Sequence, residues 1–250
     1  MGSEVVCDSQ ALASEVAVVT GASGGVGAAI AVALAKRGAT IFAVGRNREA
    51  LDRTLTAVRR YSDGTACAID LTAEDQMREL RLWLEAAGRV DILIHSAGAF
   101  QQQILADAPV RDLDSLYAVN VRAPYFLTQQ LVPFLIAARG QVVFINSSAG
   151  LSARRPDTGQ YAATKHALKA IADSLREEVN PKGIRVLTLY LGRTATPMQE
   201  ALFQLEGREY HPELLLQPED VATLLVHALM LPRTAEVTDI SVRPMIKTVW

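Results

Sequence analysis

The sequence predicts a doubly wound α/β fold: a single domain of about seven mostly parallel strands with helices on both faces. Three observations lead to this prediction. Short apolar runs rich in Val and Ile alternate along the chain with longer segments of helical period. Most of these runs are apolar throughout, as expected for strands that helices cover on both sides. No internal repeat or Pro/Ser-rich linker divides the 250 residues, a length that one α/β domain can fill.

The predicted strands span Val16 to Thr20, Thr40 to Val44, Thr65 to Ile69, Asp91 to His95, Gln141 to Asn146, Ile184 to Leu191 and Val237 to Val242. The predicted helices span Val26 to Arg37, Arg48 to Arg60, Ala73 to Ala87, Leu113 to Ala138, Gly159 to Asn180 and Pro218 to Leu231. Gly38 and Gly88 are expected to end helices, because glycine adopts the left-handed conformation without a clash. Residues 1–14 are expected to form a loose N-terminal extension. Since ligands bind beyond the carboxyl ends of parallel strands, function is expected in the segments that follow the strands.

Composition argues against several classes of function. The 25 basic and 27 acidic residues leave a formal charge of -2, so no positive surplus favours nucleic acid or an anionic membrane. Cys7 and Cys67 are too few for a disulfide framework or a cysteine metal cluster. No metal site is expected, because metal-binding spacing is absent among His95, His166, His211 and His227. Without a long apolar run or a leader pattern, we expect a soluble cytoplasmic protein.

A glycine-rich turn follows the first strand and opens a helix of small and apolar residues. Such a turn lets backbone N–H groups and the positive end of a helix approach a pyrophosphate. Glycine-rich turns also arise for purely structural reasons, so the neighbouring segments must decide. The candidate cofactor residues are Gly21, Ser23, Gly24, Gly25, Val26 and Gly27.

The ends of the next three strands extend this candidate cofactor site. After the second strand, Arg46 stands where a carboxylate would bind the adenosine ribose of NAD. A guanidinium suits a 2′-phosphate better, which favours NADP over NAD, although a solvated arginine is the simpler alternative. Asp70 and Leu71 end the third strand, where Asp70 could bind the cofactor, cap the next helix, or both. Small residues after the fourth strand would let adenine and ribose lie close to the backbone, namely Ser96, Ala97 and Gly98.

Four further residues form a candidate catalytic group. Asn120 is a polar amide within an apolar helical pattern, which indicates either a fixed functional hydrogen bond or a structural one. Ser148 follows the fifth strand, and thirteen residues later Tyr161 opens a long helix with Lys165 four residues beyond it. Residues four apart share a helix face, so the ammonium is expected beside the phenol and should lower its pKa. Ser148 would then bind the substrate oxygen while the phenol transfers a proton.

Together these residues resemble the short-chain dehydrogenase/reductase family in its compact one-domain Rossmann form, and the resemblance covers nearly the whole chain. The turn from Thr20 to Gly27 is similar to the Thr-Gly-x-x-x-Gly-x-Gly motif of the family. The remaining matches fall in the order and spacing of the family: Asp70, Ala97-Gly98, Asn120, Ser148, Tyr161 and Lys165. Two departures are His95-Ser96, where the family usually has Asn-Asn, and Leu191, where a proline commonly precedes Gly192.

The resemblance implies hydride transfer between NADP and a small or medium carbonyl or alcohol, with Tyr161 as general acid or base. It implies that Lys165 binds the nicotinamide ribose, that Ser148 orients the substrate, and that Asn120 holds a water in a proton relay. Thr194 and Thr196 would lie near the nicotinamide carboxamide. It also implies a homodimer or homotetramer. The alternatives are a non-catalytic NADP(H) sensor or scaffold, which the intact Ser, Tyr and Lys disfavour, and an epimerase or dehydratase, which the short C-terminal part disfavours.

The segment after the sixth strand, residues 197–216, is expected to form a lid over the substrate. It mixes apolar side chains such as Met198 and Phe203 with charged ones such as Glu206 and Arg208. Neither a purely apolar nor a strongly anionic substrate is therefore indicated. Residues of two other connections are expected to line the same opening: Gln101, Gln102, Gln103 and Arg154.

Overall fold

The structure, a computed structural model, describes residues 10–246 and contains one seven-stranded sheet in the order β3-β2-β1-β4-β5-β6-β7. All neighbouring strands are parallel. The doubly wound Rossmann fold is therefore confirmed. After β3 the chain crosses to β4 beside β1, and this reversal of strand order creates the crevice in which such sheets bind ligands. The strands are β1 Val16–Thr20, β2 Thr40–Gly45, β3 Gly64–Ala68, β4 Ile92–His95, β5 Gln141–Ser147, β6 Arg185–Leu191 and β7 Asp239–Val242.

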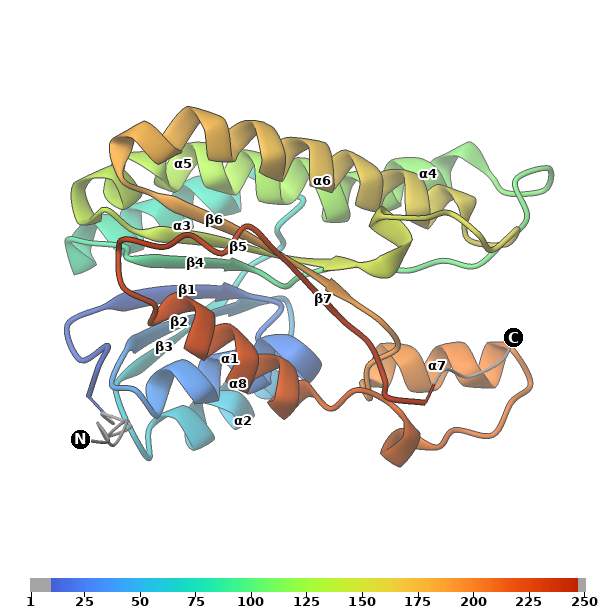
Figure 1. Cartoon of the computed structure of the whole chain (residues 1–250), viewed down its shortest axis with the longest axis horizontal. Helices are drawn as coiled ribbons and strands as arrows, with labels where there is room; N and C mark the ends of the chain where they lie inside the picture. Colours follow the sequence, from blue (N-terminus) through green and yellow to red (C-terminus); the bar gives the residue numbers. More distant parts are fainter. Residues whose placement is uncertain (1–9, 247–250) are drawn as a thin grey trace.

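Helices cover both faces of the sheet (Figure 1), with α1, α2 and α8 below it and α3 to α6 above it. Alternate strand residues enter two separate cores, so that Val19 faces α1 and α8 whereas Val18 faces α3, α5 and α6. Burial on both sides explains why the strands are apolar throughout. The helices are α1 Gly25–Ala35, α2 Arg48–Val58, α3 Glu74–Ala87, α4 Val110–Tyr117, α5 Ala123–Ala138, α6 Gly159–Val179, α7 Pro197–Leu205 and α8 Pro218–Leu229.

Two regions of the chain differ from the sequence prediction. The single helix expected from Leu113 to Ala138 begins earlier, at Val110, and a π-helical turn, η1 (Ala118–Arg122), separates α4 from α5. Within the segment expected only as a lid, α7 forms, with a Thr196 cap and a proline at its first position. The other predicted boundaries agree with the structure within two residues. Gly88 does end α3 with φ +78, as predicted.

Residues 1–9 of the expected N-terminal extension, with Cys7, lie outside the described residues. Residues 10–14 are not loose. Leu12 is buried and its backbone N–H donates to the Arg37 carbonyl over 2.8 Å. Ala13 lies against Gly38, which adopts φ +91. The segment therefore packs on the loop between α1 and β2.

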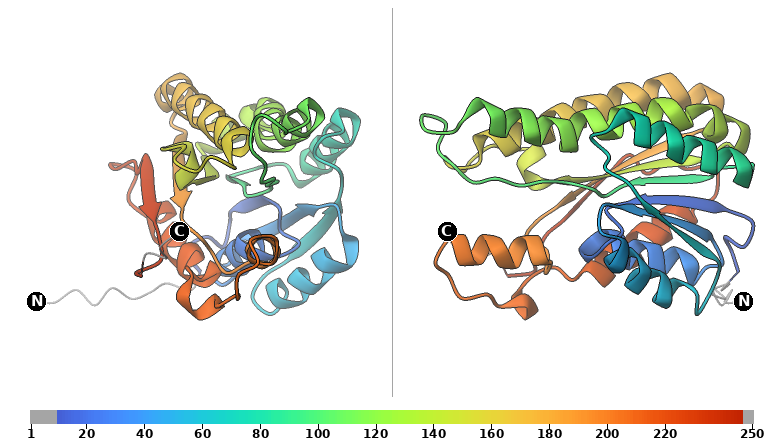
Figure 2. Two further views of the ribbon diagram at one scale, coloured as in Figure 1. Left: turned by 90° about the vertical axis from the view of Figure 1, so that its right-hand side faces the viewer. Right: turned by 180° about the vertical axis from the view of Figure 1, so that it is seen from behind.

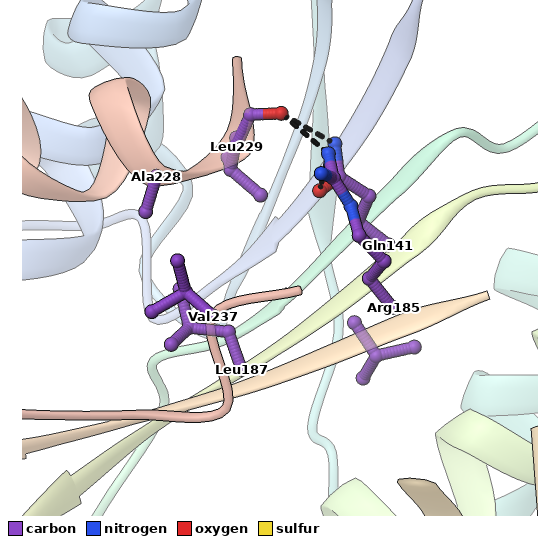
Figure 3. A pocket seen from close by; sticks show the side chains of 7 residues that line it. Gln141, Arg185, Leu187, Ala228, Leu229 and Val237 are labelled. Carbon is purple, nitrogen blue, oxygen red and sulfur yellow. Dashed lines mark hydrogen bonds between the residues drawn. The ribbon is translucent and has the colours of Figure 1, made fainter. Parts of the chain in front are cut away.

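The end of the sheet where the strands begin carries a structural polar network (Figure 3). The buried Arg185 guanidinium donates to the Leu229 carbonyl over 2.7 Å and to the Leu231 carbonyl over 3.0 Å. Gln141 donates to the same Leu229 carbonyl over 3.1 Å. These side chains satisfy carbonyl groups at the end of α8, which have no partners within the helix. The small cavity beside them lies at the edge of the sheet opposite to the segments that follow the strands.

The other edge is where the strands end, and α7 lies there together with the connections that follow β4 and β5 (Figure 2). No helix among residues 10–246 is both long enough and apolar enough to cross a membrane.

Candidate active site

The glycine-rich turn packs tightly against its surroundings. A Cβ on Gly27 would lie 2.4 Å from the Gly21 carbonyl oxygen, and a Cβ on Gly21 would lie 2.7 Å from the backbone nitrogen of Ala97. Gly21 also adopts φ +68, a conformation that side-chain-bearing residues rarely take. These two glycines therefore allow the turn, α1 and the end of β4 to meet.

The N-terminus of α1 is open toward the crevice. Its N-cap is Gly24, which provides no side-chain cap, and its first turn carries no acidic residue. Val26 lies in this first turn, and Gly25 faces Thr196, whose Cγ2 would be 3.0 Å from a Cβ at Gly25. Backbone N–H groups at such an end, together with the helix dipole, favour an anion.

Thr20 was not predicted as a site residue, although it organises this edge of the sheet. Its buried hydroxyl donates to the Ile94 carbonyl over 3.1 Å and accepts from the backbone N–H groups of Ser96 and Ala97, at 3.0 and 3.1 Å. It thereby joins the end of β1 to the turn after β4 that leads to Gly98. The sequence signal was a polar residue at the end of an otherwise apolar buried strand.

Arg46 and Asp70 lie close enough to interact, at the ends of β2 and β3. Arg46 is exposed on the turn before α2, and the Ser23 hydroxyl lies against the neighbouring Gly45, 2.4 Å from where a Cβ would be. The Asp70 carboxylate accepts from the Thr72 backbone N–H and hydroxyl, both at 2.8 Å. These bonds, with a smaller contribution from Arg46, hold the pKa of Asp70 below its usual value. Asp70 thus closes a turn before α3, whose N-cap is Ala73. Leu71 is buried in the core.

Tyr161 lies in the first turns of α6 and meets the end of β5. Its phenol is hydrogen-bonded to the side chain of Ser147, and the Phe100 ring contacts it edge-on at 4.8 Å between centroids. The sequence prediction had assigned this place to Ser148. In the structure Ser147 lies at this place, because β5 extends to Ser147 whereas Ser148 begins the exposed turn η2 (Ser148–Gly150).

Lys165 lies one helical turn beyond Tyr161, as its spacing predicted. Its buried Nζ is 5.7 Å from the centre of the Tyr161 ring and donates to the Ile145 carbonyl over 3.4 Å. A Cβ on Gly98 would be only 3.8 Å from this nitrogen. Burial lowers the pKa of Lys165 to about 8. The ammonium therefore faces the turn after β4, and hydrogen bonds within residues 10–246 use only part of its donor capacity.

The expected lowering of the phenol pKa is not found for the polypeptide by itself. Burial raises the pKa of Tyr161, and the hydrogen bond with Ser147 opposes this effect only in part. Burial disfavours the charged form of the phenol, and it dominates the pKa at this site. The phenol is therefore held in its protonated form at neutral pH.

Asn120 lies in the π-helical turn and its amide is fully engaged. It donates to the Ala99 carbonyl over 2.9 Å and to the Thr164 hydroxyl over 3.1 Å, and it accepts from the Ala99 N–H over 2.8 Å. Of the two interpretations of this residue, these bonds match the structural one. They fix the turn after β4 to α6, one residue before the Phe100 that contacts Tyr161.

His95, at the family's usual asparagine position, is a packed residue. Its ring is buried, stacks on Phe144 at 4.9 Å, and lies 2.8 Å from the Thr128 hydroxyl through Nε2. Burial lowers its pKa to about 3, so it is neutral. Within residues 10–246, no three His, Cys, Asp or Glu side chains gather as a metal site requires.

The connection after β6 closes the crevice from the other side. The buried Thr194 hydroxyl donates to the Gly192 carbonyl over 3.1 Å, and Thr194 bridges to Leu216. Thr196 caps α7 by accepting from the Gln199 N–H over 3.3 Å. The predicted residues Gly25, Gly98, Thr196, Tyr161 and Lys165 thus come together at one edge of the sheet, around the open end of α1.

This arrangement fits a dinucleotide. The open end of α1 would hold the diphosphate. The small residues Ala97 and Gly98 would let a nucleoside lie close to the backbone. The Lys165 ammonium has donors for a ribose hydroxyl.

Comparison with known proteins agrees with the geometry. The model of the short chain dehydrogenase family matches residues 15–207. An uncharacterized short-chain type dehydrogenase/reductase of Sinorhizobium fredii is 34% identical over 236 residues, which cover 92% of this chain and 91% of that protein. The chain belongs to the short-chain dehydrogenase family. It is therefore related to a large group of oxidoreductases.

Solved structures of short-chain dehydrogenases are similar over almost the whole chain. A metagenomic short-chain oxidoreductase, crystallised in complex with NADP, is 29% identical with a TM-score of 0.81, covering 94% of this chain and 100% of that one. RhlG of Pseudomonas aeruginosa, in an active-site complex with NADP, is also 29% identical with a TM-score of 0.82, covering 94% and 97%.

Proposed function

We propose that this short-chain dehydrogenase is an NADP-dependent oxidoreductase that transfers a hydride between nicotinamide and a small or medium carbonyl or alcohol. One observation carries the proposal. The Tyr161 phenol is hydrogen-bonded to Ser147, has the Lys165 ammonium beside it, and lies at the same sheet edge as the open end of α1. A group that could donate a proton thus lies at the same end of the sheet as a helix N-terminus that suits a diphosphate.

In this proposal the polypeptide positions and protonates the substrate oxygen. A bound nicotinamide would supply or accept the hydride. The Ser147 hydroxyl would bind the oxygen as negative charge develops on it, and Tyr161 would deliver the proton as general acid. Lys165 would hold the ribose and stabilise charge on the phenol. Asn120 would keep the turn after β4 in place, and residues 197–216 would cover the substrate.

The protonated phenol of Tyr161 can serve as the acid in a carbonyl reduction. A carbonyl reduction needs a protonated donor, and burial raises the pKa of this phenol. Lys165, with a pKa of about 8, is mostly charged at pH 7. As negative charge forms on the phenol during the reaction, this cation would stabilise it.

Replacing Tyr161 by phenylalanine tests the chemistry. We expect Tyr161→Phe to lose at least ~100-fold in kcat, since general acid catalysis supplies factors of this size, while NADPH affinity stays within about twofold of wild type. Turnover would be followed by nicotinamide absorbance with a panel of ketones and aldehydes, and binding by fluorescence. Retained turnover would show that another group donates the proton. Tight NADPH binding by the wild type without turnover of any substrate would favour a cofactor sensor.

The preference for NADP is tested at Arg46. Arg46 is exposed, and its guanidinium can form two hydrogen bonds with a 2′-phosphate, whereas the neighbouring Arg48 is paired with Asp52 at 3.1 Å. We expect Arg46→Ala to raise the KM for NADPH at least ~10-fold, as for loss of a charge-assisted bidentate bond, and to leave the KM for NADH nearly unchanged. Arg48→Ala is the matched control. Equal changes for both cofactors in Arg46→Ala would refute the assignment.

A further inference from the structure

A single carboxylate organises the end of α7. Glu206 is the C-cap of this helix, and its side chain is only 9% exposed. It accepts from Arg193 Nη2 at 2.7 and 2.9 Å, from Arg155 Nη1 at 2.9 Å and from Arg208 Nη1 at 3.4 Å. Three guanidinium groups thus converge on one buried acid.

The three arginines that bind Glu206 come from two different segments of the chain. Arg193 and Arg208 belong to the same connection as Glu206, the one between β6 and α8, and both lie over the Phe203 ring, at 4.6 and 5.1 Å. They therefore hold the end of α7 together as one unit. Arg155 belongs to the connection between β5 and α6, so its bond to Glu206 crosses from one connection to the other.

Arg155 is itself fixed in place. It binds Asp157 through two bonds, from Nε at 3.1 Å and from Nη2 at 2.9 Å. Asp157 in turn accepts from the Gln102 side-chain amide through its carboxylate, and from the Gln103 N–H through its backbone carbonyl at 2.8 Å. Gln102 and Gln103 belong to a third connection, the one between β4 and α4. This connection also contains Phe100, whose ring contacts Tyr161. A continuous chain of contacts thus runs from α7 to the phenol.

The Glu206 carboxylate in this series of contacts remains charged at neutral pH. Burial raises the pKa of Glu206, but the hydrogen bonds from Arg193 and Arg155 outweigh it and leave the pKa below its ordinary value. Partly buried charge pairs of this kind are screened less by salt than exposed ones. A purely local role in packing α7 would need Arg193 and Arg208 only, and would not require the bond that reaches Arg155.

We propose that the Arg155–Glu206 ion pair is a latch that holds α7 closed over the substrate in the reaction proposed above. Both residues are positioning residues, because they act on substrate through α7 and through Phe100. For substrate to enter and product to leave, the Arg155–Glu206 bond breaks while Arg193 stays with Glu206, so α7 moves as a unit with its own connection.

Hydrogen exchange tests the latch without depending on turnover. In the full chain with NADPH bound, we expect Glu206→Gln and Arg155→Met each to speed amide exchange in residues 197–216 about 5- to 20-fold, the range for loss of one coupled contact. The effect in the double variant should be smaller than the two single effects combined, because both substitutions break the Arg155–Glu206 bond. Each also has an effect of its own, since Glu206→Gln weakens the bonds from Arg193 and Arg155→Met removes those to Asp157. Glu209→Gln is the control, since this carboxylate on the same segment is 83% exposed and pairs with His211.

Kinetics provide a second measurement. We expect the KM for the carbonyl substrate to rise about tenfold in both latch variants and kcat to change less than threefold, with Arg155→Lys restoring most of the loss. Wild-type exchange rates in both variants, or additive effects in the double variant, would overturn the latch. An absence of turnover in the wild type would count against the proposed function alone, because the exchange result would still stand.

Discussion

Two adjacent serines at the end of β5 have different surroundings. Ser147 is the last strand residue, is partly buried, and accepts from the Ala149 N–H over 3.1 Å while it contacts the phenol. Ser148 is exposed on the following turn. Which hydroxyl meets the substrate oxygen therefore depends on where the strand stops.

Substituting each serine separates the two positions. We expect Ser147→Ala to lower kcat about 100-fold or more, as for loss of one donor to a developing oxyanion. Ser148→Ala should remain within about twofold of wild type, because it removes an exposed hydroxyl that does not contact Tyr161. Steady-state kinetics on both variants measure this. The reverse order of effects would restore Ser148 as the substrate-binding residue.

At the scale of elements, the contact between α1 and the turn after β1 determines the shape of the cofactor site. Gly27 lies inside α1. In the interior of an exposed helix, glycine lowers stability by about 1 kcal/mol relative to alanine. Its small size is nevertheless required here, because any Cβ would meet the Gly21 carbonyl oxygen at 2.4 Å. Close packing of backbone on backbone outweighs helix propensity at this position.

Gly27→Ala is therefore expected to destabilise the protein by about 2 kcal/mol, in the range for overpacked sites. Gly24→Ala is the matched control, since nothing lies within 4 Å of a Cβ there and its φ of 173 is ordinary extended backbone. Urea unfolding of the two variants measures the difference. Equal stability of Gly27→Ala and wild type would mean that α1 can shift away from the turn at no cost.

Across the whole molecule, the two ends of the parallel strands carry different kinds of polar residues. The candidate active site lies where the strands end. Where the strands begin, buried polar groups serve to stabilise the fold. Among the latter, Glu15 has a carboxylate oxygen that is buried without a hydrogen-bond partner in the described part of the chain. Burial raises the pKa of Glu15, and the nearby Asp91 raises it further.

A raised carboxyl pKa makes folding less favourable at neutral pH. Well below pH 4.5 the group is protonated in both folded and unfolded chains and its penalty is absent; above the raised folded pKa the penalty is fully present. We therefore expect Glu15→Gln to stabilise the protein by about 1 kcal/mol at pH 7.5 and by almost nothing at about pH 3.5. Urea unfolding at the two pH values measures this, with Glu79→Gln, exposed on α3, as control. A gain that is equal at both pH values would exclude the charge as its cause.

The sequence by itself determined the fold class, five of the eight helices closely, and most of the residues that meet in the crevice. Apolar runs buried on both faces report a parallel sheet, and the spacing from Tyr161 to Lys165 follows from helix geometry alone. The tertiary structure decided which residues from distant parts of the sequence are in contact. It placed Ser147 rather than Ser148 at the phenol, raised the pKa of Tyr161 through burial, and joined Arg155 to Glu206. These outcomes arise from burial and from contacts between segments far apart in the chain, neither of which a local pattern contains.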